Sequence, residues 1–307
     1  MICPDIEELL ALQRQAKVLQ FASNSKTKSK LAGNYASVFR GRGMEFDEVR
    51  QYVAGDDVRN IDWRVTARTN IPHLKVFKEE RERSVIICVD ASAHMQFGTR
   101  GTFKAVQAAR AVALLGWGAA HNNDKVGGLV VGNVKNGMKF YKPSNSRHAF
   151  FQMLKLLSEE DTYKTTKTDN SRLDDAVKAM VKTVTTGSLI FIIADFNHIG
   201  SEFEKNLSAL SRKCKVVLLP VCDPADGNIE ALGSLVFIND EQDKVILDTS
   251  NAKGRRAYLA SWQNWQKLFS DITVKFNVPV IWLYTNQDVY ECLVAGLNKM
   301  KASKVRG

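Results

Sequence analysis

Two short apolar runs, each ending in an aspartate, constrain the fold of this chain more than any other feature. They are residues 84–90 (SVIICVD) and 188–195 (SLIFIIAD). A nearly continuous run of this length is typical of a strand buried on both faces, as in a parallel sheet covered by helices. From residue 84 onwards, such runs alternate with helical patterns, which predicts right-handed βαβ units. We therefore expect an α/β fold, Rossmann-like, with a mainly parallel sheet flanked by helices.

The apolar periodicity predicts the individual elements of this fold. We expect helices at 5–20, 102–121, 146–157, 172–184, 202–210, 256–276 and 289–299, and strands at 84–90, 126–131, 138–141, 188–195, 215–221 and 278–284. Residues 223–250 interrupt this alternation, and they predict an inserted hairpin with strands at 235–238 and 244–247.

The chain divides near residue 83, where the residue usage changes. Residues 1–83 contain 15 basic and 12 acidic groups and few apolar runs, whereas most apolar runs follow. We expect residues 1–83 to form an N-terminal helix followed by a small, charged α+β module. Residues 84–307 are then the sheet domain, with the hairpin inserted in it.

The net charge excludes few classes of partner, but other features of the sequence restrict the partners and the location of the protein. The net charge is +10, which permits nucleic acid, an anionic membrane or an acidic protein as partner. The basic segments at 26–30 and 299–306 do not alternate with aromatic residues, so we expect no specific nucleic acid, and a membrane contact stays open. No run approaches about 18 apolar residues, so we expect no membrane span. The five cysteines form no CxxC pair, which favours a reduced, cytoplasmic protein.

The ends of the two apolar runs suggest a metal site. Function in such a sheet usually lies beyond the carboxyl ends of its strands, where Asp90, Ser92 and Asp195 are expected. Ser171, just before a predicted helix, adds a second hydroxyl. Carboxylates, hydroxyls and water suit a divalent cation such as Mg²⁺ or Mn²⁺. Alternatively, both acids cap helices or accept hydrogen bonds from loop amides.

This layout resembles the von Willebrand factor A fold and its metal-ion-dependent adhesion site. That motif is DxSxS on a first loop, a Thr on a second and an Asp on a third. Asp90 and Ser92 match the first loop, Ser171 stands in place of the Thr, and Asp195 matches the third loop. His94 replaces the second Ser of the motif. Because imidazole suits softer metals than Mg²⁺, His94 as a ligand would favour a softer ion, and the site is otherwise lost or completed by water.

A denser set of matching positions lies upstream of the first strand. It reads Arg50-x-Tyr52-x-x-Gly55-Asp56-Asp57-x-Arg59-x-Ile61-Asp62-Trp63, then Ala67-Arg68 and Phe77-x-x-Glu80-Arg81. This pattern looks like that of a bacterial family, the domain-of-unknown-function 58 proteins, which are von Willebrand A-like. The resemblance implies a non-enzymatic adaptor that works with an AAA+ ATPase of the MoxR type in the maturation or remodelling of other proteins.

The same segment predicts a surface for binding other proteins. Trp and Arg dominate binding hot spots, and arginine offers planar donors to carboxylates. The candidate residues are Arg59, Asp62, Trp63, Arg64 and Arg68. Alternatively, their charges form ion pairs that fix the module on the sheet domain, with Trp63 as a packed anchor.

Two other functions use the loops at the sheet edge differently. The first is a metal-free scaffold, in which His94 marks a degenerate metal site. The second is a metal-dependent hydrolase, for which His94 is the only candidate base beside a nucleophile. A P-loop and the GxGxxG, GxSxG and HExxH motifs are absent from the chain.

Overall fold

The computed structural model describes residues 3–17, 19, 44–79, 83–164, 172–197, 199, 201–238 and 244–305. The chain forms two compact units. The larger unit comprises Met1–Ala22 and Arg83–Gly307, and the smaller unit comprises Ser23–Glu82.

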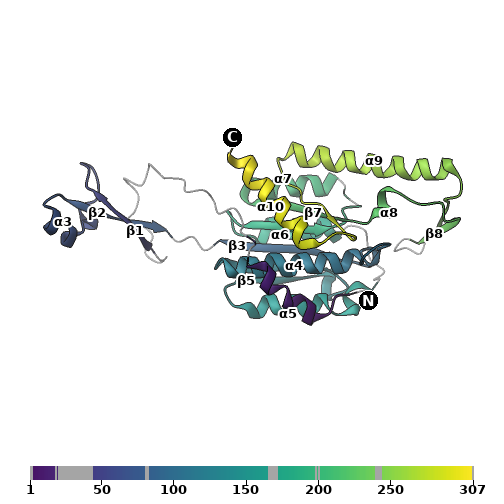
Figure 1. Ribbon diagram of the computed structural model, residues 1–307, viewed down its shortest axis with the longest axis horizontal. Coiled ribbons are helices and arrows are strands. Elements are labelled where there is room, and N and C mark those ends of the chain that lie inside the picture. Colours follow the sequence, from purple (N-terminus) through teal and green to yellow (C-terminus); the bar gives the residue numbers. More distant parts are fainter. Residues whose placement is uncertain are drawn as a thin grey trace. The chain divides into compact units, whose positions relative to one another are not determined.

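A six-stranded sheet forms the centre of the larger unit, in the order β10-β7-β6-β3-β4-β5 (Figure 1). The ladders are parallel, except that β5 pairs antiparallel with β4 at one edge. The strands are β3 (Ser84–Ala91), β4 (Lys125–Gly132), β5 (Met138–Ser144), β6 (Leu189–Ala194), β7 (Lys215–Cys222) and β10 (Leu283–Tyr284). Because β3 lies between β4 and β6, the strand order reverses there. This is the position at which such sheets open a crevice.

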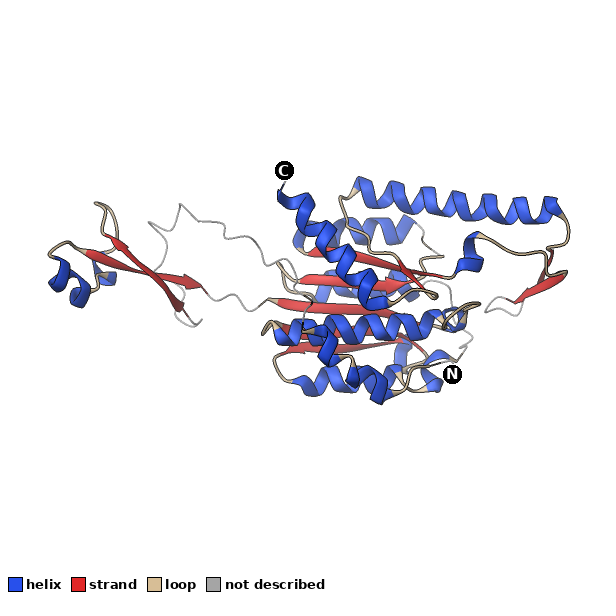
Figure 2. Cartoon of the chain, in the orientation of Figure 1, coloured by secondary structure: helices blue, strands red, loops and turns tan. Residues whose placement is uncertain are grey.

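Helices cover both faces of this sheet (Figure 2). One face packs against α1 (Ile6–Ala11), α2 (Gln13–Ala16), α4 (Lys104–His121), α5 (Arg147–Leu157) and α10 (Val289–Val305). The other face packs against α6 (Arg172–Thr183), α7 (Ser201–Lys213) and α9 (Ala252–Lys275). Successive residues of β3 alternate between the two hydrophobic cores, with Val85 and Ile87 in the first and Ile86 and Cys88 in the second. This arrangement confirms the predicted α/β architecture, a mainly parallel sheet flanked by helices.

The remaining elements are short. The smaller unit contains β1 (Met44–Gln51), which pairs antiparallel with β2 (His73–Glu79), and α3 (Trp63–Thr69) between them. The predicted insertion contains α8 (Pro224–Gly227) and a hairpin of β8 (Ser234–Ile238) and β9 (Lys244–Asp248). Four 3-10 helices complete the described part, η1 (Val58–Asn60), η2 (Ala93–Gln96), η3 (Lys135–Gly137) and η4 (Glu160–Tyr163). Across the described residues, no helix is both long and apolar enough to span a membrane.

The N-terminal helix belongs to the larger unit, which corrects its predicted grouping with the charged module. Leu9 is fully buried in the core beneath α4, and the Trp117 indole N–H donates to the Leu9 carbonyl over 3.1 Å. The apolar face of this helix is therefore covered by α4, and the smaller unit lies within the sequence of the larger one.

The chain leaves and re-enters the larger unit at one turn. The Asn122 side-chain amide donates to the Leu19 carbonyl over 3.3 Å. Arg83 forms an ion pair with Asp124 at 2.9 Å, and its carbonyl accepts from the Lys125 amide, also at 2.9 Å. Both junctions are thus held by the turn between α4 and β4.

Candidate functional site

Asp90 is the penultimate residue of the central strand β3, and it is 4% exposed. The Ser92 amide donates to Asp90 Oδ1 over 2.9 Å, and the Ser92 hydroxyl donates to the same oxygen. This local turn leads directly into η2, which returns the chain toward the strand end and brings His94 over the carboxylate.

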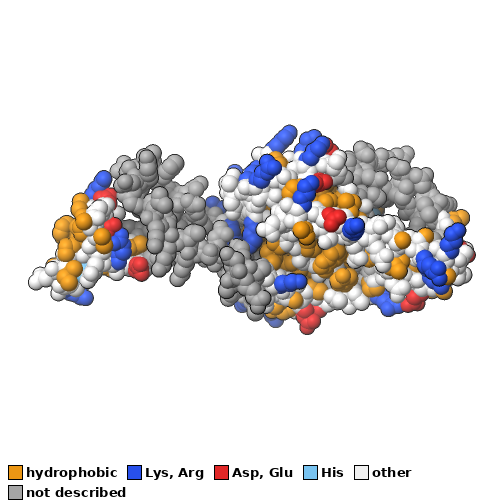
Figure 3. All heavy atoms as spheres, turned by 90° about the horizontal axis from the view of Figure 1, so that it is seen from above, with side chains coloured by type: hydrophobic (Ala, Val, Ile, Leu, Met, Phe, Trp, Pro, Cys, Tyr) orange, Lys and Arg blue, Asp and Glu red, His pale blue; other side chains and the backbone are white. Residues whose placement is uncertain are grey.

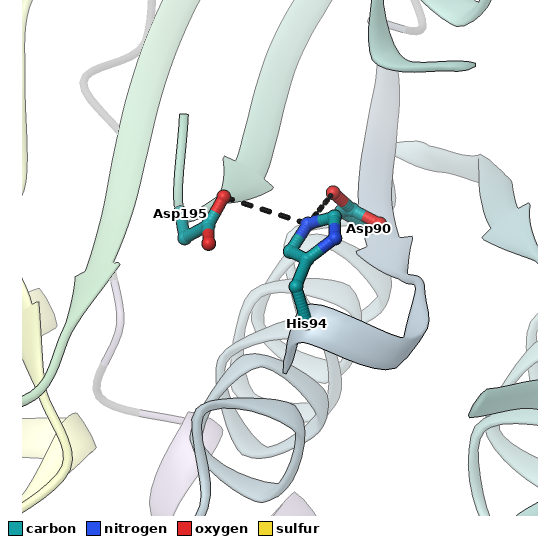
Figure 4. Close-up of side chains that lie close together, drawn as sticks. All are labelled: Asp90, His94 and Asp195. Carbon is teal, nitrogen blue, oxygen red and sulfur yellow. Dashed lines mark hydrogen bonds and ion pairs between the residues drawn. The ribbon is translucent and has the colours of Figure 1, made fainter. Parts of the chain in front are cut away.

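His94 lies between two buried aspartates (Figure 4). Its Nε2 atom is 3.0 Å from Asp90 Oδ2 and 3.5 Å from Asp195 Oδ1. Asp195 directly follows β6, the neighbour of β3, and is 4% exposed. The side chain of His94 is 29% exposed, so solvent reaches the group from that side. The predicted convergence of two strand-end acids is therefore present.

The group can hold a metal ion. One ligand atom each from Asp90, His94 and Asp195 lies within 4.8 Å of the other two. Burial raises the pKa of Asp90, but the His94 charge and hydrogen bonds from His94 and Ser92 outweigh burial and lower it overall. Asp90 is thus a carboxylate at neutral pH. Two carboxylates and one imidazole are a donor set for Mn²⁺ or Zn²⁺ rather than Mg²⁺.

The backbone after Asp195 is unusual. Phe196 has φ +55°, which costs a residue with a bulky side chain about 1–2 kcal/mol. The Asn197 amide and side chain donate to the two Asp195 oxygens, over 3.2 and 2.6 Å. Strain of this kind is retained where surrounding contacts impose it.

A neighbouring buried polar cluster was not predicted. Asp223 directly follows β7 and accepts from the Thr99 amide over 2.9 Å and from the Thr285 hydroxyl over 2.6 Å. Lys104, the first residue of α4, has a side chain only 3% exposed and forms a 2.8 Å ion pair with Asp226. Burial lowers the pKa of Lys104, but Asp195 and Asp226 outweigh burial and raise it. Lys104 therefore supplies a buried positive charge next to the Asp195 loop.

The sequence could have predicted Asp223 as a residue at a strand end, but it could not have predicted the burial of Lys104. The run 215–223 (KVVLLPVCD) ends in an aspartate like the runs before Asp90 and Asp195. A lysine at the start of a helix carries no sign of burial. Ser171 lies outside the described residues, so its predicted role as a ligand stays a prediction.

The predicted protein-binding residues of the smaller unit separate into two groups. Asp62 caps α3 by accepting from the Arg64 and Val65 amides over 3.1 and 3.2 Å, and Arg59 pairs with Asp57 at 3.2 Å. The Asp62 contacts stabilise the start of α3, whereas the Arg59 side chain is 81% exposed and its role in binding a partner stays a prediction. Trp63 is instead 70% exposed, so the smaller unit itself does not bury it as an anchor.

Arg64 and Arg68 are exposed on the same helix as Trp63, and neither forms an ion pair with a described residue. Other exposed apolar side chains of this unit are Val53, Val58 and Ile71. Figure 3 shows hydrophobic and basic side chains next to one another on the smaller unit. This combination is typical of protein-binding surfaces.

Comparison with known families shows to which family the chain belongs. Residues 48–267 match the family described as "Protein of unknown function DUF58". The chain belongs to this family. The DUF58 match includes α3, Asp90, His94 and Asp195, so both candidate surfaces lie inside it.

A relative of this DUF58 protein is the uncharacterized protein Rv1480 of Mycobacterium tuberculosis, 28% identical over 76% of this chain and 72% of the relative. Among solved structures, the conserved hypothetical protein BatB of Bacteroides thetaiotaomicron is similar, with 17% identity and a TM-score of 0.43 over 72% of this chain and 99% of that chain. A von Willebrand factor type A protein from Catenulispora acidiphila has 10% identity and a TM-score of 0.36, covering 73% and 42%. Similarities of this size carry no functional argument.

Proposed function

We propose that this DUF58 protein is a non-enzymatic, protein-binding adaptor whose docking centre is the Asp90–His94–Asp195 group. The observation that carries the proposal is the convergence of two buried carboxylates on a partly exposed imidazole at the strand-order reversal. The only exposed member of the group is the one that a partner would meet first.

The proposed centre uses a divalent cation, Mn²⁺ or Zn²⁺, held by Asp90 and Asp195 with His94 as a nitrogen ligand. The cation would supply a positive charge with an open position for a carboxylate of the partner. The chain's own residues fix that charge at the edge of the sheet, because Ser92 and Asn197 orient the two aspartates.

Calorimetric titration of the pure, chelator-treated protein tests this centre. We expect Mn²⁺ or Zn²⁺ to bind at least about tenfold more tightly than Mg²⁺, because imidazole prefers these ions. Asp90→Asn should weaken binding at least about tenfold, since it removes a charged ligand. Asp271→Asn is the control, because Asp271 is exposed near the carboxyl end of α9 and is not one of the three candidate ligands. No uptake of any of the three cations would remove the metal from the proposal, and the adaptor function would remain.

A metal-free scaffold is a second candidate, and one observation favours it. His94 Nε2 contacts both carboxylates, which is how a protonated imidazole neutralises a pair of acids without a metal. In that case the docking centre is the histidine itself, and a chelator has no effect on partner binding.

The hydrolase alternative has less support. The Ser92 hydroxyl donates to Asp90 rather than to His94, so the arrangement lacks the serine–histidine contact of an activated nucleophile. Phosphatase and esterase substrates, tested with each cation, distinguish a hydrolase from an adaptor.

The proposed partner is an AAA+ ATPase of the MoxR type, which we infer from the family resemblance alone. The proposed contact is the surface of Trp63, Arg64 and Arg68 on α3, because its charges are exposed and have no acidic partner in the described part of the unit. A cytoplasmic location fits this proposal, since all five cysteines are free thiols.

Charge reversal at α3 tests the ATPase contact. We expect the Arg64→Glu/Arg68→Glu double variant to weaken binding to the MoxR-type ATPase of the same organism at least about tenfold, as like charges would face each other. Trp63→Ala should weaken it similarly while changing the free energy of unfolding by less than about 0.5 kcal/mol. Val274→Ala, 76% exposed on α9, is the control. Unchanged binding of both α3 variants in surface plasmon resonance would exclude this surface.

A further inference from the structure

The Asp195 loop is held by α9, a helix from a distant part of the chain. The Trp265 indole N–H donates to the Phe196 carbonyl over 2.8 Å. Phe196 is the left-handed residue that directly follows Asp195, and it is 1% exposed. The Phe196–Asn197 peptide, whose N–H donates to Asp195, is therefore bonded to α9.

Aromatic rings fix the Phe196 side chain as well. Its ring lies 5.1 Å from that of Phe269 on α9 and 5.8 Å from that of Phe203 on α7. Trp265 stacks on Phe269 at 5.5 Å and on Trp262 at 4.6 Å. Rotating the Phe196 backbone to the ordinary right-handed region would break the indole bond and move the ring out of this packing.

The orientation of the Asp195 carboxylate depends on this backbone conformation. The Asn197 amide can reach Asp195 Oδ1 only if the Phe196 peptide keeps its direction, and Asn197 also holds Oδ2 through its side chain. The carboxylate so held lies 3.5 Å from His94 Nε2. Phe196 is a bulky residue in the left-handed region, directly after a candidate ligand. A functional constraint on that ligand would explain why the strained conformation is retained.

We propose that Trp265 is a positioning residue for Asp195, which acts by holding the Phe196 carbonyl. The inference deepens the proposed docking centre and rests on that proposal only for its effect on cation binding. It also explains why α9 contributes to the site without any ligand of its own, because α9 sets the direction of a loop that does carry one.

Two matched substitutions on α9 test the proposal. Trp265→Phe keeps an aromatic ring and removes the donor to Phe196. Trp262→Phe makes the same chemical change in the same stack, but Trp262 forms no hydrogen bond to the described residues of the Asp195 loop. A melting curve for each variant shows whether both remain folded, and similar melting temperatures make the comparison specific to the indole bond.

The first readout needs no metal. In protein with ¹⁵N-labelled histidine, we expect five pairs of ring-nitrogen resonances, one pair for each histidine. The pair that is missing from the spectrum of His94→Gln belongs to His94. We expect Trp265→Phe to move the Nε2 resonance of His94 and to speed exchange of the Asn197 amide about tenfold, as the loss of one hydrogen bond would. Trp262→Phe should leave both unchanged. If the two variants give the same His94 resonance and the same exchange rate, the proposal is wrong.

The second readout links the inference to the docking centre. If the parent protein binds Mn²⁺, Trp265→Phe should weaken its affinity about tenfold, and Trp262→Phe less than about twofold. If the parent binds no cation, the metal part of the proposed function fails, and the resonance and exchange data still decide the role of Trp265. Equal Mn²⁺ affinity for parent and Trp265→Phe, with an unmoved His94 resonance, would overturn the inference alone.

Discussion

Replacing Lys104 by methionine is expected to lower the free energy of unfolding by about 3–5 kcal/mol, because the change leaves Asp226 buried without its counter-charge. The Lys104 and Asp226 side chains are 3% and 12% exposed and 2.8 Å apart, and the Asp195 charge also acts on Lys104. Methionine has a similar volume, so a cavity does not add to the loss. For a unit of this size the melting temperature should fall by roughly 10 °C in calorimetry.

The pH dependence of the Lys104→Met variant gives an internal check. Burial raises the pKa of Asp226, and Lys104 opposes this rise. Without Lys104 the pKa rises further, so the folded variant takes up a proton more readily than the unfolded chain. The destabilisation caused by the substitution should therefore shrink as the pH is lowered from neutral, because Asp226 becomes protonated in the folded variant.

Two further variants isolate the ion pair. Adding Asp226→Asn to Lys104→Met should recover most of the lost stability, because the buried charge is then removed as well. Lys205→Met should cost less than about 1 kcal/mol, since Lys205 and Glu202 form an exposed pair with side chains 70% and 59% accessible. A double variant no more stable than Lys104→Met would show that the loss has another cause.

The second large effect is expected for His94→Ser. This change recreates the DxSxS spacing and removes the imidazole that lies 3.0 and 3.5 Å from the two aspartates. In chelator, the facing carboxylates should destabilise the protein by about 1–3 kcal/mol. Mg²⁺ at about 100 times its dissociation constant should restore about 2.7 kcal/mol, measured as a rise in melting temperature.

The same variant separates a metal-dependent centre from a metal-free one. His94→Ser should bind Mg²⁺ at least about tenfold more tightly than the parent, and lose affinity for Zn²⁺ if His94 is a ligand. His94→Gln is the control, because it removes the charge without adding a small hydroxyl. A His94→Ser protein whose melting temperature is independent of Mg²⁺ would contradict a cation position between Asp90 and Asp195.

Much of the larger unit could be predicted because its strands are buried on both faces. Runs such as SVIICVD leave little choice of structure, and β3, β4, β6 and β7 occur where they were expected. The predicted strand at 278–284 contributes only Leu283–Tyr284 to the ladder, with an isolated bridge at Val280. Pro279 has no amide to donate there, so the ladder cannot extend regularly through it.

The smaller unit was harder to predict because its elements are short and poorly buried. Only Leu74 is buried among its described side chains. Neither β1 nor α3 therefore has the apolar periodicity from which a strand or a helix is predicted. At the site, the strand-end rule was sufficient for Asp90 and Asp195. The position of His94 depends on the turn of η2, and the burial of Lys104 depends on packing between distant loops. Neither is visible in a local pattern.

The turn between α4 and β4 holds both junctions of the smaller unit, through Leu19 and Arg83. It lies at the amino end of β3, whereas Asp90 lies at the carboxyl end, roughly 20 Å away along the strand. Both links to the smaller unit therefore meet the larger unit at the end of β3 that is remote from the acids, and the length of the strand separates them from Asp90.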